Sequence, residues 1–218
     1  MNIVLAGAPG SGKGVQAKLI SKKYGSFQLS TGELFRKIGR ESDDPLARKI
    51  KELIDRGEFV PDDITCEFVV RELKTNKFKN GFIMDGFPRN LNQAKIFDEI
   101  LAGSKKKIDF VFRIVASDEL VIKRLSGRRS CEKCNADYNI YFKNTNFEDK
   151  CDKCSGKLTK REDDHEDVIK GRLNIYHTID LELTKYYEKK ALLININGEK
   201  EASAVFSDIV AKIEKSND

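Results

Sequence analysis

The sequence predicts an α/β fold in which helices cover both faces of a parallel sheet, and three observations carry this prediction. Short apolar runs typical of buried strands alternate with longer segments whose apolar residues recur at helical spacing. The first run, residues 2–6, leads directly into a glycine-rich loop and a helix. A later run, residues 81–84, ends at an aspartate. Ligands of such sheets bind at the carboxyl ends of the strands, so we expect the site there.

The glycine-rich loop is Gly7-Ala8-Pro9-Gly10-Ser11-Gly12-Lys13-Gly14. Its backbone N–H groups can converge on an anion at the start of the next helix, and its glycines allow a close approach. The pattern is typical of a nucleoside triphosphate site in which Lys13 contacts the β and γ phosphates. Gly14 replaces the hydroxyl residue that usually ligates Mg²⁺, so water and another group must hold the ion. The alternative is a glycine-rich turn without a ligand.

Residues 27–29 give a second strand signal, and Ser30 then has the spacing of a capping box for a helix. Residues 43–45 end this helix, a second one runs to Gly57, and a third begins after Pro61. We therefore expect a small helical insertion over residues 30–60.

Asp85 follows the third strand and is predicted to face the Mg²⁺ of the nucleotide, although a capping or turn role is the alternative. A helix at 91–101, a strand at 108–115 and a helix at 117–125 continue the alternation. Such alternation predicts right-handed crossovers between parallel strands.

The alternation stops at Gly127, and the polar segment 128–164, with a strand-like piece at 138–142, contains four of the five cysteines. They form two C-x-x-C pairs separated by sixteen residues, Cys131 with Cys134 and Cys151 with Cys154. This spacing is typical of a tetrahedral structural Zn²⁺ site, and two disulfides or iron in the same sulfur cage are the alternatives. The fifth cysteine, Cys66, is predicted to be a small core residue.

A long helix with apolar residues from Val168 to Tyr187 follows, and Asp163-Asp164 suit its N-terminus. A strand at 191–196 and a helix with core residues between 204 and 213 complete one α/β core with two insertions.

Net charge and hydropathy argue against two classes of function, nucleic-acid binding and membrane spanning. A net charge of +5 suits anionic substrates but falls short of the basic face of a nucleic-acid binder. No apolar run approaches the roughly 18 residues of a membrane span, and the phosphate loop begins within seven residues of the N-terminus. We expect a cytoplasmic protein that binds neither nucleic acid nor membrane.

Arginines flank the predicted strands and insertions, and their planar forks suit phosphate oxygens. Each alone would be an ordinary surface residue, but near a triphosphate loop they predict a cage for two polyphosphates, made by Arg36, Arg89, Arg124, Arg128, Arg161 and Arg172.

Five stretches together resemble the adenylate kinases, in the long bacterial-type form with a zinc-bearing lid: residues 7–14, 29–33 (LSTGE), 85–89 (DGFPR), 127–129 (GRR) and 161–164 (REDD). The resemblance covers essentially the whole chain. It implies a P-loop NTPase-like parallel sheet flanked by helices, with a core at 1–29, 61–126 and 165–218. It also implies an AMP-binding insertion at 30–60, a zinc-binding lid over ATP at 127–164, and a monomer that catalyses ATP + AMP ⇌ 2 ADP with Mg²⁺.

The resemblance further implies site residues. Those expected to bind ATP are Gly10, Ser11, Gly12, Lys13, Gly14, Val15, Arg124, Arg128, Asp137, Tyr138 and Lys200. Those expected to bind AMP are Thr31, Arg36, Glu58, Phe59, Val60, Gly86, Phe87, Pro88, Arg89, Gln93, Arg161 and Arg172. The catalytic set is Lys13, Asp85, Arg89, Arg124, Arg128, Arg161 and Arg172, and the metal ligands are Cys131, Cys134, Cys151 and Cys154.

Thr31 favours an adenine acceptor, because related pyrimidine-nucleotide kinases tend to have Ala there, and the Gln93 amide can pair with an adenine edge. The sequence departs from the family pattern at Val15, at Asn139 and at 143–145, where altered lid stiffness or rate is expected. UMP, CMP or GMP are alternative acceptors. A zinc ribbon that binds RNA is a further alternative, motivated by Lys133, Lys143, Lys150, Lys153, Lys157 and Lys160, although acidic residues lie among them.

Overall fold

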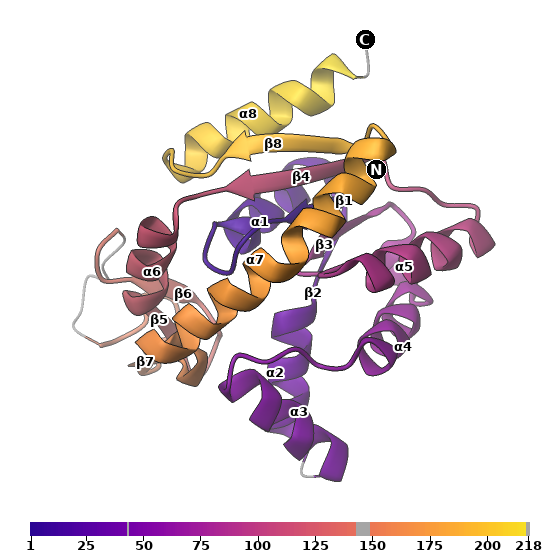
Figure 1. Ribbon diagram of the computed structural model, residues 1–218. Helices are drawn as coiled ribbons and strands as arrows, with labels where there is room; N and C mark the ends of the chain where they lie inside the picture. Colours follow the sequence, from indigo (N-terminus) through magenta and orange to yellow (C-terminus); the bar gives the residue numbers. More distant parts are fainter. Residues whose placement is uncertain (43, 143–148, 217–218) are drawn as a thin grey trace.

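The core of the computed structural model is a five-stranded, fully parallel sheet in the order β2-β3-β1-β4-β8 (Figure 1). The structure describes residues 1–42, 44–142 and 149–216. The strands are β1 (Asn2–Ala6), β2 (Phe27–Ser30), β3 (Phe82–Asp85), β4 (Phe110–Val115) and β8 (Leu193–Asn197). The predicted α/β class and the order of its elements are confirmed.

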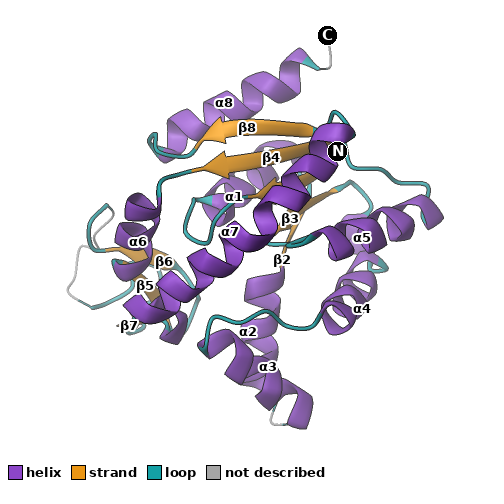
Figure 2. Ribbon diagram, in the orientation of Figure 1, coloured by secondary structure: helices purple, strands orange, loops and turns teal. Residues whose placement is uncertain are grey.

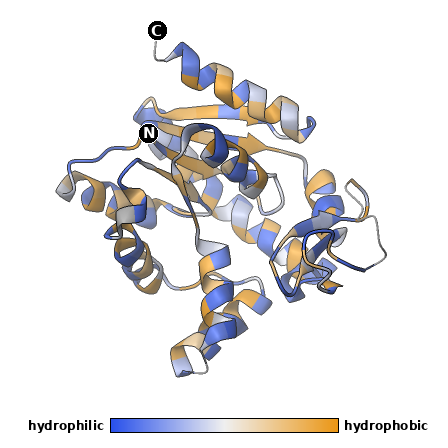
Figure 3. Cartoon of the chain, turned by 180° about the vertical axis from the view of Figure 1, so that it is seen from behind, coloured by the Kyte–Doolittle hydropathy of each residue, from blue (hydrophilic) through white to orange (hydrophobic). Residues whose placement is uncertain are grey.

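Helices cover both faces of the sheet, as Figure 2 shows. One face packs against α4 (Asp62–Leu73), α5 (Leu91–Gly103) and α7 (Glu166–Lys189), and the other against α1 (Lys13–Tyr24) and α8 (Ala202–Lys215). Successive strand residues serve opposite faces: Val4 belongs to the first layer, and its neighbours Ile3 and Leu5 belong to the second. Apolar residues dominate β1 and β3 at the centre of the sheet (Figure 3), as expected for doubly covered strands, whereas the other three strands also contain polar residues such as Gln28, Arg113 and Asn195.

The insertion after β2 consists of α2 (Thr31–Glu41) and α3 (Pro45–Asp55). Ser30 caps α2 by accepting a hydrogen bond from the Glu33 N–H, and Asp44 caps α3 by accepting one from the Ala47 N–H at 2.9 Å. The insertion has a small core of its own, formed by Phe35, Ile50 and Val60. Ile64 and Phe68 of α4 also pack against this small core, and the insertion lies below the sheet in Figure 1.

The second insertion follows α6 (Asp118–Ser126) and contains a three-stranded antiparallel sheet, β6-β5-β7. Its strands are β5 (Arg128–Cys131), β6 (Asp137–Asn139) and β7 (Leu158–Thr159). The strand expected at 138–142 is therefore wrong beyond residue 139, because the Asn139 side chain accepts a hydrogen bond from the Tyr141 N–H and turns the chain. Residues 143–145, where the sequence departs from the family pattern, lie outside the described residues. They include Lys143, one of the lysines that motivate the RNA-binding alternative.

Two short 3₁₀ helices complete the elements, η1 (Asn76–Phe78) and η2 (Glu162–Asp164). The second corrects the sequence reading, because Asp163 and Asp164 precede α7 and are buried, rather than forming its first turn. Within the described parts of the chain, none of the helices combines the length and apolarity that a membrane crossing needs.

Candidate active site

The phosphate loop connects β1 to α1 at the carboxyl edge of the sheet. Lys13 lies at the first turn of α1, and its Nζ donates hydrogen bonds to the carbonyl oxygens of Gly7 and Ala8, both at 2.7 Å. Burial lowers the pKa of Lys13 to about 8, a change that Asp85 opposes. An ammonium held here has lost most of its hydration and is therefore well placed to attract an anion.

Asp85 ends β3 next to β1 and faces the same loop. A Cβ added to Gly14 would lie 3.3 Å from Asp85 Oδ2, so the carboxylate occupies the neighbourhood of the missing hydroxyl side chain. Burial raises the pKa of Asp85, and Lys13 opposes that rise. A divalent cation bound with a nucleotide would favour the ionised carboxylate, so the donor chemistry fits Mg²⁺.

A large cleft opens above the loop. It is bounded by α1, α6, the turn after β8 and the second insertion (residues 127–164), which is called the lid below. Arg124 of α6 connects the phosphate loop to the turn after β8. Its guanidinium donates hydrogen bonds to the carbonyl oxygens of Ser11 at 3.1 Å and Gly198 at 2.9 Å. The cleft contains all the residues predicted to bind ATP: Gly10, Ser11, Gly12, Lys13, Gly14, Val15, Arg124, Arg128, Asp137, Tyr138 and Lys200.

Tyr138 needs a closer description, because its phenol is buried in the lid. Its Oη lies 3.4 Å from Cys151 Sγ and accepts a hydrogen bond from the Asp152 N–H. The side chain therefore packs with the cysteines, and only other parts of this residue are available to the cleft.

A smaller pocket lies between the helical insertion and the core. Phe35, Ile54 and Val60 supply apolar lining, and guanidinium groups of Arg36, Arg89 and Arg172 supply positive charge. Predicted AMP residues that line it are Thr31, Arg36, Glu58, Phe59, Val60, Arg89, Gln93 and Arg172. This lining suits a ligand with a planar apolar group, which would contact the apolar side chains, and an attached anion, which would contact the guanidinium groups.

The DGFPR turn divides between the two cavities and the core. Gly86 and Pro88 line the large cleft, and the Gly86 carbonyl accepts hydrogen bonds from Thr31 Oγ1 and Arg89 Nε, both at 2.8 Å. Phe87, by contrast, is fully buried and packs edge-on against Phe97, with 5.1 Å between ring centroids. Its side chain belongs to the core and reaches neither cavity.

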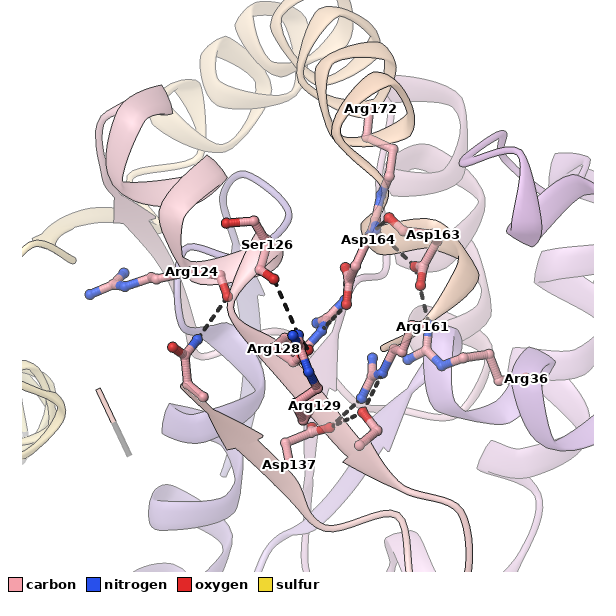
Figure 4. A network of polar contacts seen from close by, with 12 residues as sticks. Arg36, Arg124, Ser126, Arg128, Arg129, Asp137, Arg161, Asp163, Asp164 and Arg172 are labelled. Carbon is pink, nitrogen blue, oxygen red and sulfur yellow. Dashed lines mark hydrogen bonds and ion pairs between the residues drawn. The ribbon is translucent and has the colours of Figure 1, made fainter. Parts of the chain in front are cut away.

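Arginines from three parts of the chain converge on two buried aspartates (Figure 4). Arg128 forms a two-pronged pair with Asp164, at 2.7 and 2.6 Å. Arg172 donates to Asp163 at 2.8 Å, and Arg36 lies 3.8 Å from the same carboxylate. Arg161, also from the lid, donates to Asp137 and Ser130. The cage predicted from the arginines thus includes acidic partners.

Sequence reasoning missed these partners because it assigned Asp163 and Asp164 to a helix start. The available signal was two adjacent aspartates, two and three positions after Arg161, at the end of an insertion that carries Arg128 and Arg161 of the predicted cage.

Charge is compensated unevenly within this cluster. Burial would lower the pKa of Arg128, but the adjoining Asp164 outweighs it and raises that pKa. Burial lowers the pKa of Arg36 to about 9 and that of Arg89 to about 10. The positive charge of Arg36 and Arg89, which line the pockets, is thus less fully compensated by carboxylates than that of Arg128, and it favours an anionic ligand.

The cysteine cluster lies in the second insertion, and none of its four cysteines lines either of the two cavities. All four sulfur atoms are within 4.8 Å of one another, with Cys131 and Cys154 at 3.4 Å and Cys134 and Cys151 at 3.5 Å. Sulfurs around one Zn²⁺ at about 2.3 Å would be about 3.8 Å apart, so the donor set fits such an ion. A disulfide needs about 2.05 Å, and the cysteines are free.

The fold and site define a nucleoside monophosphate kinase, with a phosphate loop and two adjoining cavities. Comparison with known proteins is more specific: residues 5–192 match the family model described as adenylate kinase. The chain is 41% identical over 215 residues to an adenylate kinase of Archaeoglobus fulgidus, covering 99% of both chains. It is 43% identical over 210 residues to one of Clostridium tetani, covering 96% of both. The chain belongs to the adenylate kinase family.

Proposed function

We propose that the chain catalyses ATP + AMP ⇌ 2 ADP, with ATP in the large cleft and AMP in the smaller pocket. One observation carries this assignment: Arg36, Arg89 and Arg172 line both cavities. Two nucleotides whose phosphates meet at these shared guanidinium groups would have their reacting ends side by side. Phosphoryl transfer between them requires that arrangement.

The reaction requires alignment, charge neutralisation and exclusion of water, and no protein nucleophile. The loop amides and Lys13 would hold the ATP phosphates, and Arg89 and Arg172 would stabilise charge on the transferred group. Arg124, Arg128 and Arg161 would close the cage from the ATP and lid sides. Asp85 and water would hold Mg²⁺, which supplies further charge neutralisation to the phosphates.

The two insertions have separate tasks in this proposal. Residues 30–60 bind AMP, and residues 127–164 form a lid over ATP that Zn²⁺ on the four cysteines stabilises. The lid cluster has few apolar residues besides the cysteines, such as Tyr138 and Leu158, so a metal would contribute much of its stability. We further propose a cytoplasmic monomer.

The test is to mix the protein with ATP, Mg²⁺ and each of AMP, GMP, CMP and UMP, and to measure nucleoside diphosphates. We expect ADP from AMP, with far less product from the other acceptors. Lys13→Ala and Arg89→Ala should each lower kcat by about 100-fold or more while the protein stays folded. Arg71→Ala is the matched control, because Arg71 is exposed and its ion pair with Glu67 and its contact with the Phe68 ring both lie within its own helix. No diphosphate from any acceptor would refute the proposal.

A further inference from the structure

Gln93 is a buried amide in the wall of the smaller pocket, only 1% exposed. It lies in the first turn of α5, where its N–H donates to the capping Asn90 side chain at 2.8 Å. Its side-chain Oε1 accepts a hydrogen bond from the Arg89 N–H at 2.8 Å, and its Nε2 donates to Asp62 Oδ1 at 2.7 Å.

These two contacts determine how the side-chain amide of Gln93 is oriented, that is, which position its oxygen occupies and which its nitrogen occupies. A backbone N–H can only donate, so it must face Oε1, and an ionised carboxylate can only accept, so it must face Nε2. Turning the amide over would place Nε2 against the Arg89 N–H and Oε1 against the Asp62 carboxylate. Both contacts would then be repulsive, so the observed orientation is strongly preferred.

Asp62 is well suited to hold this orientation. Its carboxylate accepts hydrogen bonds from three amides: Gln93, Asn90 at 2.9 Å and Asn92 at 2.8 Å. Burial raises the pKa of Asp62, but the three amide donors outweigh it and the net change is downward. The carboxylate therefore stays ionised at neutral pH and acts only as an acceptor.

With these bonds made, the Gln93 amide retains one N–H and one oxygen lone pair for a ligand in the pocket. The pairing edge of adenine offers an acceptor at N1 and a donor at N6, which match a fixed N–H and a fixed oxygen. Guanine offers the reverse, a donor at N1 and an acceptor at O6. Guanine would therefore fit only if the amide turned over.

We propose that Asp62 is a positioning residue that sets the acceptor specificity of this enzyme, by fixing the Gln93 amide in the orientation that accepts adenine and rejects guanine. This inference rests on the proposed function, because it places the AMP base in the smaller pocket. It assigns Asp62 no contact with the nucleotide. A site whose buried polar groups are fixed discriminates by leaving the wrong ligand with unpaired groups.

The experiment compares kcat/KM for AMP and GMP in the full-length protein and its variants. Asp62→Ala removes one of the two contacts that orient the amide and leaves only the Arg89 N–H, so the AMP:GMP ratio should fall by about 10-fold or more, through a higher KM for AMP and a lower KM for GMP. Asp62→Asn keeps an oxygen acceptor and should restore most of the ratio. Asp63→Ala is the matched control, because Asp63 is an exposed aspartate in the same first turn of α4, and it should leave the ratio unchanged.

A general structural role for Asp62 would lower the two activities in parallel and leave their ratio intact. An AMP:GMP ratio within about twofold of wild type in folded Asp62→Ala would therefore overturn the inference. If Asp62→Ala does not fold, Asp62→Ser serves as the removal variant and is judged by the same ratio. An unchanged ratio in Gln93→Ala would also overturn it. Failure of the wild-type protein to phosphorylate AMP would instead refute the proposed function.

Discussion

Burial of Lys13 beside the phosphate loop makes nucleotide binding dependent on pH. The pKa of Lys13 is lowered from 10.5 to about 8, whereas bound phosphates would raise it again. Below about pH 8 both the free and the bound protein carry the proton. Above that pH the free protein loses it, so binding takes up a proton and the affinity for ATP falls as pH rises.

We therefore predict proton uptake on ATP binding at about pH 8.5, measurable by calorimetry in two buffers of different ionisation enthalpy. Lys13→Arg is the control, because a guanidinium stays protonated and should bind without that uptake. Equal uptake in the two proteins would show that another group titrates.

The pair between Arg128 and Asp164 gives a prediction about stability. The Asp164 side chain is fully buried, so Asp164→Asn leaves the positive charge of Arg128 poorly compensated. We expect unfolding free energy to drop by about 2–4 kcal/mol in urea titrations. Glu166→Gln, which breaks an exposed pair with Lys170, should leave the unfolding free energy nearly unchanged. Similar losses in the two variants would contradict this account.

The functional roles of individual residues differ in how far they could be predicted from the sequence alone. Lys13 and the four cysteines stand in spacings that have one dominant chemical use, so local pattern is sufficient to place them. Asp62 and Asp164 have no such spacing. Their roles depend on partners 31 and 36 residues away, which only the folded chain brings within hydrogen-bond distance.

At the scale of elements, strands and helices were predictable because the sheet is covered on both faces and its strands are short, mainly apolar runs that alternate with helical patterns. The start of α2 followed from the Ser30 cap, and the break before α3 followed from residues 43–45, whereas the capping role of Asp44 was not predicted. The lid was less predictable, since its strands are only two to four residues long and side-chain hydrogen bonds decide where they end. Its cysteine spacing nevertheless predicted that the four sulfur atoms lie close together.

The lid therefore carries the third prediction. Chelation, or Cys→Ser at any of the four positions, should lower the melting temperature by roughly 5–15 °C. Hydrogen exchange should rise in residues 128–164 and stay unchanged in β1 and α5. Cys66→Ala is the control, because Cys66 is buried within α4 and should leave the metal content intact. Protein purified without added metal that contains neither zinc nor iron would refute the metal site.

For the whole molecule, the arrangement of the insertions around the shared cavities matters most. The loop amides, Asp85 and the turn after β8 come from different strands and meet at one edge because all five strands are parallel. That convergence could be predicted from topology. One of the contacts between the insertions could not, because it joins exposed side chains that no local pattern links. Arg40 of α2 donates to Asn135 of the lid at 3.0 Å.

This contact leads to the last prediction, which concerns closure over the nucleotides. If lid opening limits turnover, single-turnover phosphoryl transfer will be faster than kcat. Arg40→Ala removes a hydrogen bond made only when the insertions approach, so opening becomes easier. KM for AMP should then rise about 2–5-fold while kcat stays level or increases. Lys37→Ala should change neither constant, because Lys37 pairs within its own helix with Glu41. A large fall in kcat with unchanged KM would mean that Arg40 acts on the chemical step, and the closure argument would be wrong.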